Sequence, residues 1–120
     1  MTNEEYEAKL KETTDMAEAK AAELSVKLKT KVYPFSFFTG EKFVVGYLRE
    51  PNRLDKMRAI DLYDISRTQA GDHILRTSLI QEESDKEILE ENAANDTIYL
   101  GAIGYAVNIV KISAEQLKKK

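Results

Sequence analysis

Two short runs of β-branched and aromatic residues, joined by a glycine-containing turn, constrain this chain more than any other feature. The runs occupy residues 31–38 and 42–48, and Thr39-Gly40-Glu41 separates them. This pattern predicts a β-hairpin. A two-stranded hairpin is only marginally stable in water, so it must pack on helices or pair with another chain. Pro34 predicts an edge position, and Gly46 predicts a bulge or a close backbone approach.

The segment before the hairpin has the composition of a helix. Residues 3–31 contain neither proline nor glycine and are rich in Ala, Glu and Lys, which are good helix formers. Small or apolar residues recur there at alternating spacings of four and three, like a short coiled-coil seam: Leu10, Thr14, Ala17, Ala21, Leu24 and Leu28. Two interpretations remain open, a solvated helix packed on its own domain and a helix that binds a second copy or a partner.

Helical periodicity resumes after Pro51. It predicts two helices, about 53–66 and 69–81, or one helix bent near Gly71. Ser84 and Glu87 resemble a capping box that opens a short helix. The most apolar segment, residues 98–112, has apolar residues around the whole helical wheel, so we expect burial on most sides, in its own core or at a subunit contact. Ser113 is expected to cap a final short helix.

The expected fold class is therefore α+β. An N-terminal amphipathic helix occupies residues 1–30, and residues 31–120 form a single domain in which the hairpin packs on a bundle of three to four helices. A length of 120 residues fits one domain with an appended helix.

Charge and composition argue against several classes of partner. The 18 basic and 21 acidic residues leave a net charge of −3, and the locally basic stretches, 49–58 and the last three lysines, do not interleave aromatic residues. No apolar stretch reaches the roughly 18 uninterrupted residues of a membrane-spanning helix. We therefore expect neither nucleic acid nor a membrane as partner. The lack of cysteine excludes disulfides, zinc–thiolate sites and thiol nucleophiles, and it fits a reducing cytoplasm.

No catalytic constellation is recognisable in the sequence. His73 is the only histidine and has no nucleophile motif beside it, so we interpret it as structural. Seven acids crowd residues 81–96 without the pattern of a calcium loop, which favours a solvated face. Gly101 and Gly104 belong to no phosphate loop and favour close helix packing. We expect no catalytic, metal-binding or cofactor-binding residues, and hence no enzyme.

Candidate protein-binding residues come from the hairpin and the N-terminal seam. If alternate hairpin positions face the core, the other aromatic side chains form an exposed surface of the kind that binds proteins. Core packing alone is the other interpretation. The candidates are Phe35, Phe37, Phe43 and Tyr47 in the hairpin, and Leu10, Ala17, Leu24 and Leu28 in the N-terminal helix.

One run of residues resembles a known family. The predicted hairpin is followed by Tyr47-Leu48-Arg49-Glu50-Pro51-Asn52-Arg53, then by helical residues that include Ala59, Asp61 and Gly71-Asp72-His73-Ile74-Leu75, an acidic break, and an apolar helix ending in lysines. A segment of leucine, basic residue, variable residue, proline, variable residue and arginine thus links hairpin to helices. In this the chain resembles the small tail assembly chaperones of long-tailed bacteriophages, over about residues 31–120.

The resemblance implies a non-enzymatic α+β protein in the host cell cytoplasm. Such a protein self-associates into a homo-oligomer, coats the tape measure protein before the tail tube polymerises, and recruits tail tube subunits, often through a frameshifted longer product. On this chain the family pattern falls on Leu48, Pro51 and Arg53, as structural positions. A different function also remains open, that of a small acidic phage-encoded inhibitor or adaptor that binds a host protein through the acids of residues 82–91.

Overall fold

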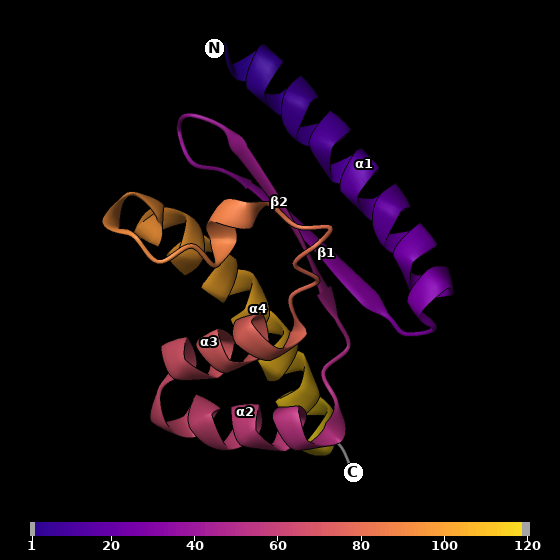
Figure 1. Ribbon diagram of the computed structural model, residues 1–120, viewed down its shortest axis with the longest axis vertical. Coiled ribbons are helices and arrows are strands. Elements are labelled where there is room, and N and C mark those ends of the chain that lie inside the picture. Colours follow the sequence, from indigo (N-terminus) through magenta and orange to yellow (C-terminus); the bar gives the residue numbers. More distant parts are fainter. Residues whose placement is uncertain (1, 119–120) are drawn as a thin grey trace.

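The computed structural model describes residues 2–118, with side chains described as far as Glu115. Its elements are α1 (Asn3–Leu28), β1 (Val32–Phe38), β2 (Phe43–Arg49), α2 (Arg53–Ile65), α3 (Arg67–Ser78), the single-turn 3-10 helices η1 (Lys86–Ile88) and η2 (Ala93–Asn95), and α4 (Asp96–Lys118). The predicted α+β fold, with an N-terminal helix, a hairpin and further helices, is confirmed. Figure 1 shows α1 on one side of the hairpin and α2 to α4 on the other.

The hairpin forms as its turn residues predict. The strands pair antiparallel in one continuous register, from Val32 opposite Arg49 to Phe38 opposite Phe43. Gly40 has a φ of 100°, in the left-handed region that glycine adopts without steric cost. Gly46 marks a close approach rather than a bulge, because the ring of its cross-strand partner Phe35 lies where a Cβ on Gly46 would stand.

The alternation of strand side chains divides the core into two clusters. The larger cluster joins one face of the hairpin to α2, α3 and α4, and its buried residues are Phe35, Val44, Leu48, Ala59, Ala70, Ile74, Leu75, Ile88, Ile98, Ala102, Ile103, Ala106, Ile109 and Val110. The smaller cluster joins the other face to α1, and its buried residues are Ala17, Ala21, Leu24, Val32, Tyr47 and Ile80. Both faces of the hairpin are thus covered by helices of the same chain.

Helix α1 turns its predicted seam toward the hairpin. It ends at Lys29, whose φ of 55° breaks the helix, and the Ser25 hydroxyl then accepts a hydrogen bond of 3.1 Å from the Val32 amide. This bond fixes the end of α1 to the start of β1. The last turns of α1 are therefore held against the domain that follows, and its buried residues Ala17, Ala21 and Leu24 lie just before this point.

The break between α2 and α3 lies at Ser66, not at Gly71. The Ser66 hydroxyl accepts from the Gln69 amide and caps α3, while the Ser66 amide bonds the Leu62 carbonyl and ends α2. Of the two predicted alternatives, two helices near 53–66 and 69–81 is close to the structure. The single helix bent near Gly71 is wrong, because that glycine lies inside α3 and serves helix packing. A Cβ there would stand 2.9 Å from the backbone oxygen of Ile103 on α4.

Residues 79–85, which we call the strap, cover the outer edge of β2. The Ile80 amide donates to the Tyr47 carbonyl at 2.8 Å, and the Asp85 amide donates to the Val45 carbonyl at 3.0 Å. In return the Tyr47 amide donates to the Ser84 hydroxyl at 3.0 Å, and the Val45 amide donates to the Asp85 carboxylate at 2.9 Å. The strap therefore completes the hydrogen bonds that a third strand would make.

Ser84 does not open a helix as the capping-box pattern predicted. The short helix η1 follows Asp85 and has no side-chain capping bond. Because the Ser84 hydroxyl is buried against β2, the strand amide takes the acceptor that a helix amide would have used. The expectation of a separate helix capped by Ser113 is also wrong, since its hydroxyl donates to the Ile109 carbonyl within a continuous α4.

Helix α4 crosses the molecule behind the hairpin and buries one side in the larger cluster. Its other side leaves Leu100 60% exposed, Tyr105 42% and Ile112 43%. By length and composition alone, residues 93–115 are apolar enough to cross a membrane, which the count of uninterrupted apolar residues did not predict. Only 33% of that window is buried, and the buried side packs on α3 and the hairpin. One such helix is weak evidence of a membrane span, because a mostly buried core helix passes the same test.

Replacing Gly71 by alanine is expected to destabilise the fold by about 1–3 kcal/mol, because the new methyl group meets a backbone oxygen that cannot rotate away. Gly104 on α4 is the matched control. A Cβ on Gly104 meets nothing within 4 Å, so Gly104→Ala should stabilise the chain by up to about 1 kcal/mol through helix propensity. Urea unfolding of both variants measures the difference. Equal free energies of unfolding for the two would contradict the close α3–α4 contact.

Replacing Ser84 by alanine is expected to cost about 1–3 kcal/mol, because it leaves the buried Tyr47 amide without an acceptor. Asp85→Ala removes the acceptor of the Val45 amide and should act in the same direction. Glu82→Ala, in the same strap but exposed, is the control and should leave stability within about 0.5 kcal/mol. Thermal unfolding followed by circular dichroism checks all three, and a Ser84→Ala melting curve equal to the control would refute the role of this hydroxyl.

Candidate interaction surfaces

The aromatic residues of the hairpin do not form one exposed surface. Phe35 is 5% exposed in the larger cluster and Tyr47 is 4% exposed in the smaller one. Phe37 is half-buried, stacks on Tyr105 with ring centroids 5.9 Å apart, and lies over Gly101. Phe43 is half-buried at the other face. It contacts the rings of Phe38 and Tyr6, with centroids 4.8 and 6.0 Å away. These aromatic side chains therefore bind mainly one another and the helices of their own chain.

The candidate binding residues on α1 differ in how deeply they are buried. Ala17 and Leu24 are buried against the hairpin, Leu10 is partly buried, and Leu28 is 43% exposed at the end of the helix. The seam of α1 is thus occupied by the chain itself over its middle turns. Only its two ends retain accessible apolar surface.

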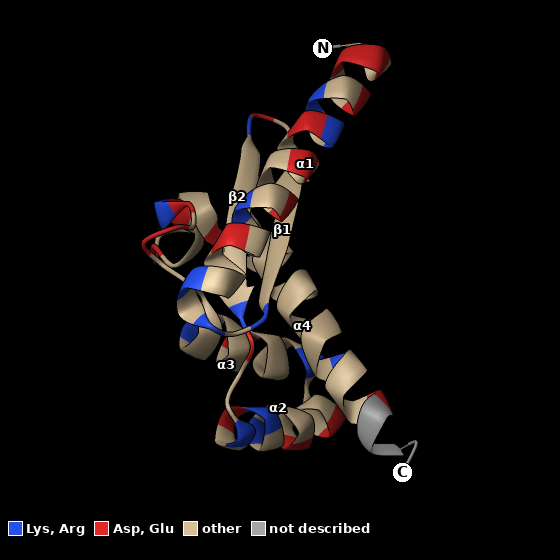
Figure 2. Cartoon of the chain, turned by 90° about the vertical axis from the view of Figure 1, so that its right-hand side faces the viewer, with Lys and Arg blue, Asp and Glu red and all other residues tan. Residues whose placement is uncertain are grey.

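A groove runs along the outer edge of β1, between α1 and α4. It consists of a hollow of about 320 Å³, lined by Leu10, Thr14, Ala17, Glu18, Pro34, Phe35, Ser36 and Tyr105. A smaller hollow of about 110 Å³ continues it, lined by Tyr33, Pro34, Phe35, Leu48, Tyr105, Asn108, Ile109 and Ile112. We call the two together the edge groove. Both α1 and α4 flank the β1 edge in Figure 2.

The floor of the edge groove carries backbone groups that β2 does not use. The Glu50 amide donates to the Lys31 carbonyl, so by the alternation of an antiparallel ladder the even-numbered residues of β1 turn their backbone groups outward. Pro34 has no amide hydrogen, and the Tyr105 hydroxyl donates to the Ser36 carbonyl at 3.0 Å. Among the described residues, the amides of Ser36 and Phe38 make no hydrogen bond. Ser36 lines the larger hollow, and Phe38 follows it two residues further along the same edge of β1.

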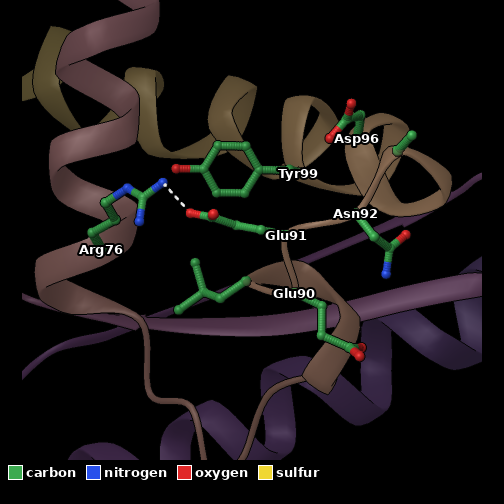
Figure 3. A pocket seen from close by; sticks show the side chains of 8 residues that line it. Arg76, Glu90, Glu91, Asn92, Asp96 and Tyr99 are labelled. Carbon is green, nitrogen blue, oxygen red and sulfur yellow. Dashed lines mark hydrogen bonds and ion pairs between the residues drawn. The ribbon is translucent and has the colours of Figure 1, made fainter.

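A second hollow, of about 390 Å³, lies between α3, the η1–η2 loop and the start of α4 (Figure 3). We call it the acidic pocket. It is lined by Arg76, Leu89, Glu90, Glu91, Asn92, Ala93, Asp96 and Tyr99.

The interior of the acidic pocket is already neutralised. The Arg76 guanidinium donates to Asp72 at 3.0 Å and to Glu91 at 3.4 Å, and it lies 5.7 Å from the centre of the Tyr99 ring. The Tyr99 hydroxyl donates to the same Asp72 carboxylate. The hydrogen bond to Asp72, followed by the Asp72 charge, raises the pKa of Arg76 above its ordinary value. The pocket therefore offers little to an anion, and the charge of its rim is negative.

Most acids of residues 81–96 are engaged within the chain. Glu83 pairs with Lys20 of α1 at 2.8 Å, Glu87 pairs with Lys42 of the hairpin turn, and Asp85 holds the Val45 amide. The hydrogen bond from Lys20 lowers the pKa of Glu83. With Glu91 bound by Arg76, the acids of this segment that make neither an ion pair nor a hydrogen bond like that of Asp85 among the described residues are Glu82, Glu90 and Asp96.

His73 joins two helices. Its Nε2 lies 3.1 Å from an oxygen of Asp55, and both side chains are about one-fifth exposed or less, so the pair links α3 to α2. Within the described part of the chain, His, Asp and Glu form no cluster of three or more that could hold a metal ion.

Glu50 connects the hairpin to α2. Its carboxylate accepts a hydrogen bond of 2.5 Å from the Tyr33 hydroxyl and pairs with Lys56 at 2.6 Å. Burial raises the pKa of Glu50, but the hydrogen bonds from Lys56 and Tyr33 outweigh it and hold the pKa below its ordinary value. Burial, and then the bond to Glu50, raise the pKa of Tyr33 well above its ordinary value.

The outer face of α2 is an apolar surface that sequence reasoning missed. Leu54 is 54% exposed, Met57 is 57% exposed and Ile65 is 79% exposed. The signal lay in the sequence, because these three recur at helical spacing on a different side from the buried Ala59. Helix α2 carries apolar residues on two sides. The small domain covers the side of Ala59, so the other side stays exposed.

Comparison of the chain with protein-family models, with curated proteins and with solved structures finds no match in any of the three.

Glu50→Gln tests the connection between the hairpin and α2. Because the folded state lowers the pKa of Glu50, its stabilisation is complete above the unfolded pKa and is lost as pH falls through the folded pKa. The variant should be less stable by about 1 kcal/mol at pH 7, and the difference should shrink between about pH 5 and 3. Urea unfolding across this range measures it, with exposed Glu41→Gln as the control. A difference that stays constant with pH would contradict the assignment.

Proposed function

We propose that this chain is a non-enzymatic assembly chaperone of the phage tail type. It acts in the host cell cytoplasm, self-associates, and binds an apolar segment of a tape measure or tail tube protein. The observation that carries the proposal is the edge groove, which combines apolar walls with unused backbone donors on the floor.

These two properties suit an extended polypeptide. Carbonyl groups of an added strand accept from the Ser36 and Phe38 amides, which supplies affinity without dependence on side chains. Alternate side chains of the same strand then contact Leu10 and Thr14 on α1 or Tyr105 on α4. Because Pro34 offers no donor, the strand pairs over a short stretch only, which favours a reversible contact over permanent sheet extension.

The segment that resembles the tail assembly chaperones supports the proposal through its structural roles. Leu48 is 1% exposed in the larger cluster, Pro51 is buried after β2, and Arg53 is the first residue of α2. Asn52 caps this helix by accepting from the Asp55 amide at 2.9 Å. The spacing of leucine, proline and arginine that the resemblance names would thus fix the angle between the hairpin and the helices.

The inhibitor function is less well supported by the geometry. A mimic of an acidic partner must present its carboxylates to solvent. Here Glu83, Asp85 and Glu87 hold the strap against α1 and the hairpin instead.

The test is binding of overlapping peptides from a tape measure protein and a tail tube protein, measured by isothermal titration calorimetry. At least one apolar peptide should bind, and Leu10→Asp and Tyr105→Ala should each weaken it by about tenfold or more. Val26→Asp is the matched control, because Val26 is 81% exposed on α1 and does not line the groove. Its affinity should equal that of the unmodified chain. Equal affinities for all variants would show that the groove is not the binding site.

A further inference from the structure

We propose that copies of this chain bind one another head to tail, with the N-terminal half of α2 of one copy docked in the acidic pocket of the next. This inference rests on the proposed function, which includes self-association, and it assigns the surfaces that carry it. The two surfaces have charges of opposite sign, and one is hollow whereas the other projects.

The acidic pocket supplies the concave, negative half. Its floor is apolar, formed by Leu89, Ala93 and Tyr99. Glu90 and Asp96 stand on its rim without an ion-pair partner among the described residues. An apolar floor with a charged rim is the arrangement of many protein-binding sites, in which the centre supplies burial and the rim supplies orientation.

The N-terminal half of α2 supplies the convex, positive half. Leu54 and Met57 project from it with more than half of their surface exposed. Arg53 and Arg58 flank them, are exposed, and make no ion pair with any described residue. Residues 53–59 hold three basic side chains against one acid, Asp55, which faces His73, so this half of the helix is net positive. The acids Asp61 and Asp64 follow in the C-terminal half.

The two surfaces cannot meet within one copy. The loop that carries Glu90 and the outer face of α2 lie on different sides of the molecule in Figures 1 and 2. A contact between them therefore needs a second copy. Because the surfaces differ, each added copy leaves one face free at either end, and the assembly closes as a ring or continues as a filament.

Two charge-reversed variants of the full chain test the contact. Arg53→Glu with Arg58→Glu blocks the α2 face, and Glu90→Lys with Asp96→Lys blocks the pocket. The unmodified chain should grow beyond a dimer with concentration in light scattering behind size-exclusion chromatography. Each variant alone should associate at least about tenfold more weakly.

Mixing the variants gives the decisive measurement. The α2 face of the pocket variant and the pocket of the α2 variant are both intact, and the reversed α2 face and the reversed pocket again carry opposite charges. An equimolar mixture should therefore regain association that neither variant shows alone. Lys11→Glu with Lys111→Glu changes net charge as much as the arginine pair does, at exposed sites outside both surfaces, and should associate like the unmodified chain. Thermal unfolding verifies that each variant is folded.

Three outcomes would overturn the head-to-tail contact: an unmodified chain that stays monomeric, a variant that associates unaided like the unmodified chain, or folded variants whose mixture stays monomeric.

Peptide binding to the edge groove separates this inference from the proposed function. Neither charge-reversed pair lines that groove. Retained peptide binding without self-association removes the inference and the self-association part of the proposed function, but leaves partner binding. Self-association without peptide binding removes the partner-binding part alone.

Discussion

The rest of this structure depends on the inability of a two-stranded hairpin to stand alone in water. Such a hairpin has two faces and two outer edges, and its own ladder satisfies none of them. Helix α1 covers one face, α3 and α4 cover the other, and the strap satisfies the edge of β2. The outer edge of β1 is the part that remains open, and a hollow of about 320 Å³ lies there. Of the two faces and two edges of the hairpin, the chain leaves the outer edge of β1 uncovered, and this explains where the groove lies.

The elements could be predicted because their signals are local. The turn at Gly40, the end of β2 before Pro51 and the helical periodicity each depend on residues within one or two turns of chain. The contacts between elements could not be predicted in this way. Ser84 looked like a helix cap because Glu87 follows it, but its hydroxyl serves the Tyr47 amide, 37 residues earlier in the chain. Gly71 fitted a helix bend by its neighbours in sequence, which was one of the two alternatives. Its actual role, to let α3 approach α4 closely, depends on Ile103 of another helix.

The same limit explains why several binding residues predicted from the sequence are buried within the chain itself. An apolar pattern identifies the side of an element that must be covered, but it does not say whether the cover is the same chain or a partner. On α1 the chain itself covers Ala17 and Leu24, whereas on α2 more than half of the Leu54 surface stays exposed. The glycines divide similarly. Close helix packing was expected at Gly101 and Gly104, but Gly101 lies under the Phe37 ring of β1 and nothing lies within 4 Å of a Cβ at Gly104.

The hairpin also separates the two clusters of the core, and this sets the order in which the chain opens. The smaller cluster contains six buried residues, and its α1 side chains contact the hairpin rather than the bundle of α2 to α4. Helix α1 can therefore detach as a cooperative unit of its own, at a lower free energy than global unfolding. Its amide protons then exchange with solvent sooner than those of α3. During each such opening Tyr47, a core residue of the closed form, becomes accessible while the larger cluster stays intact.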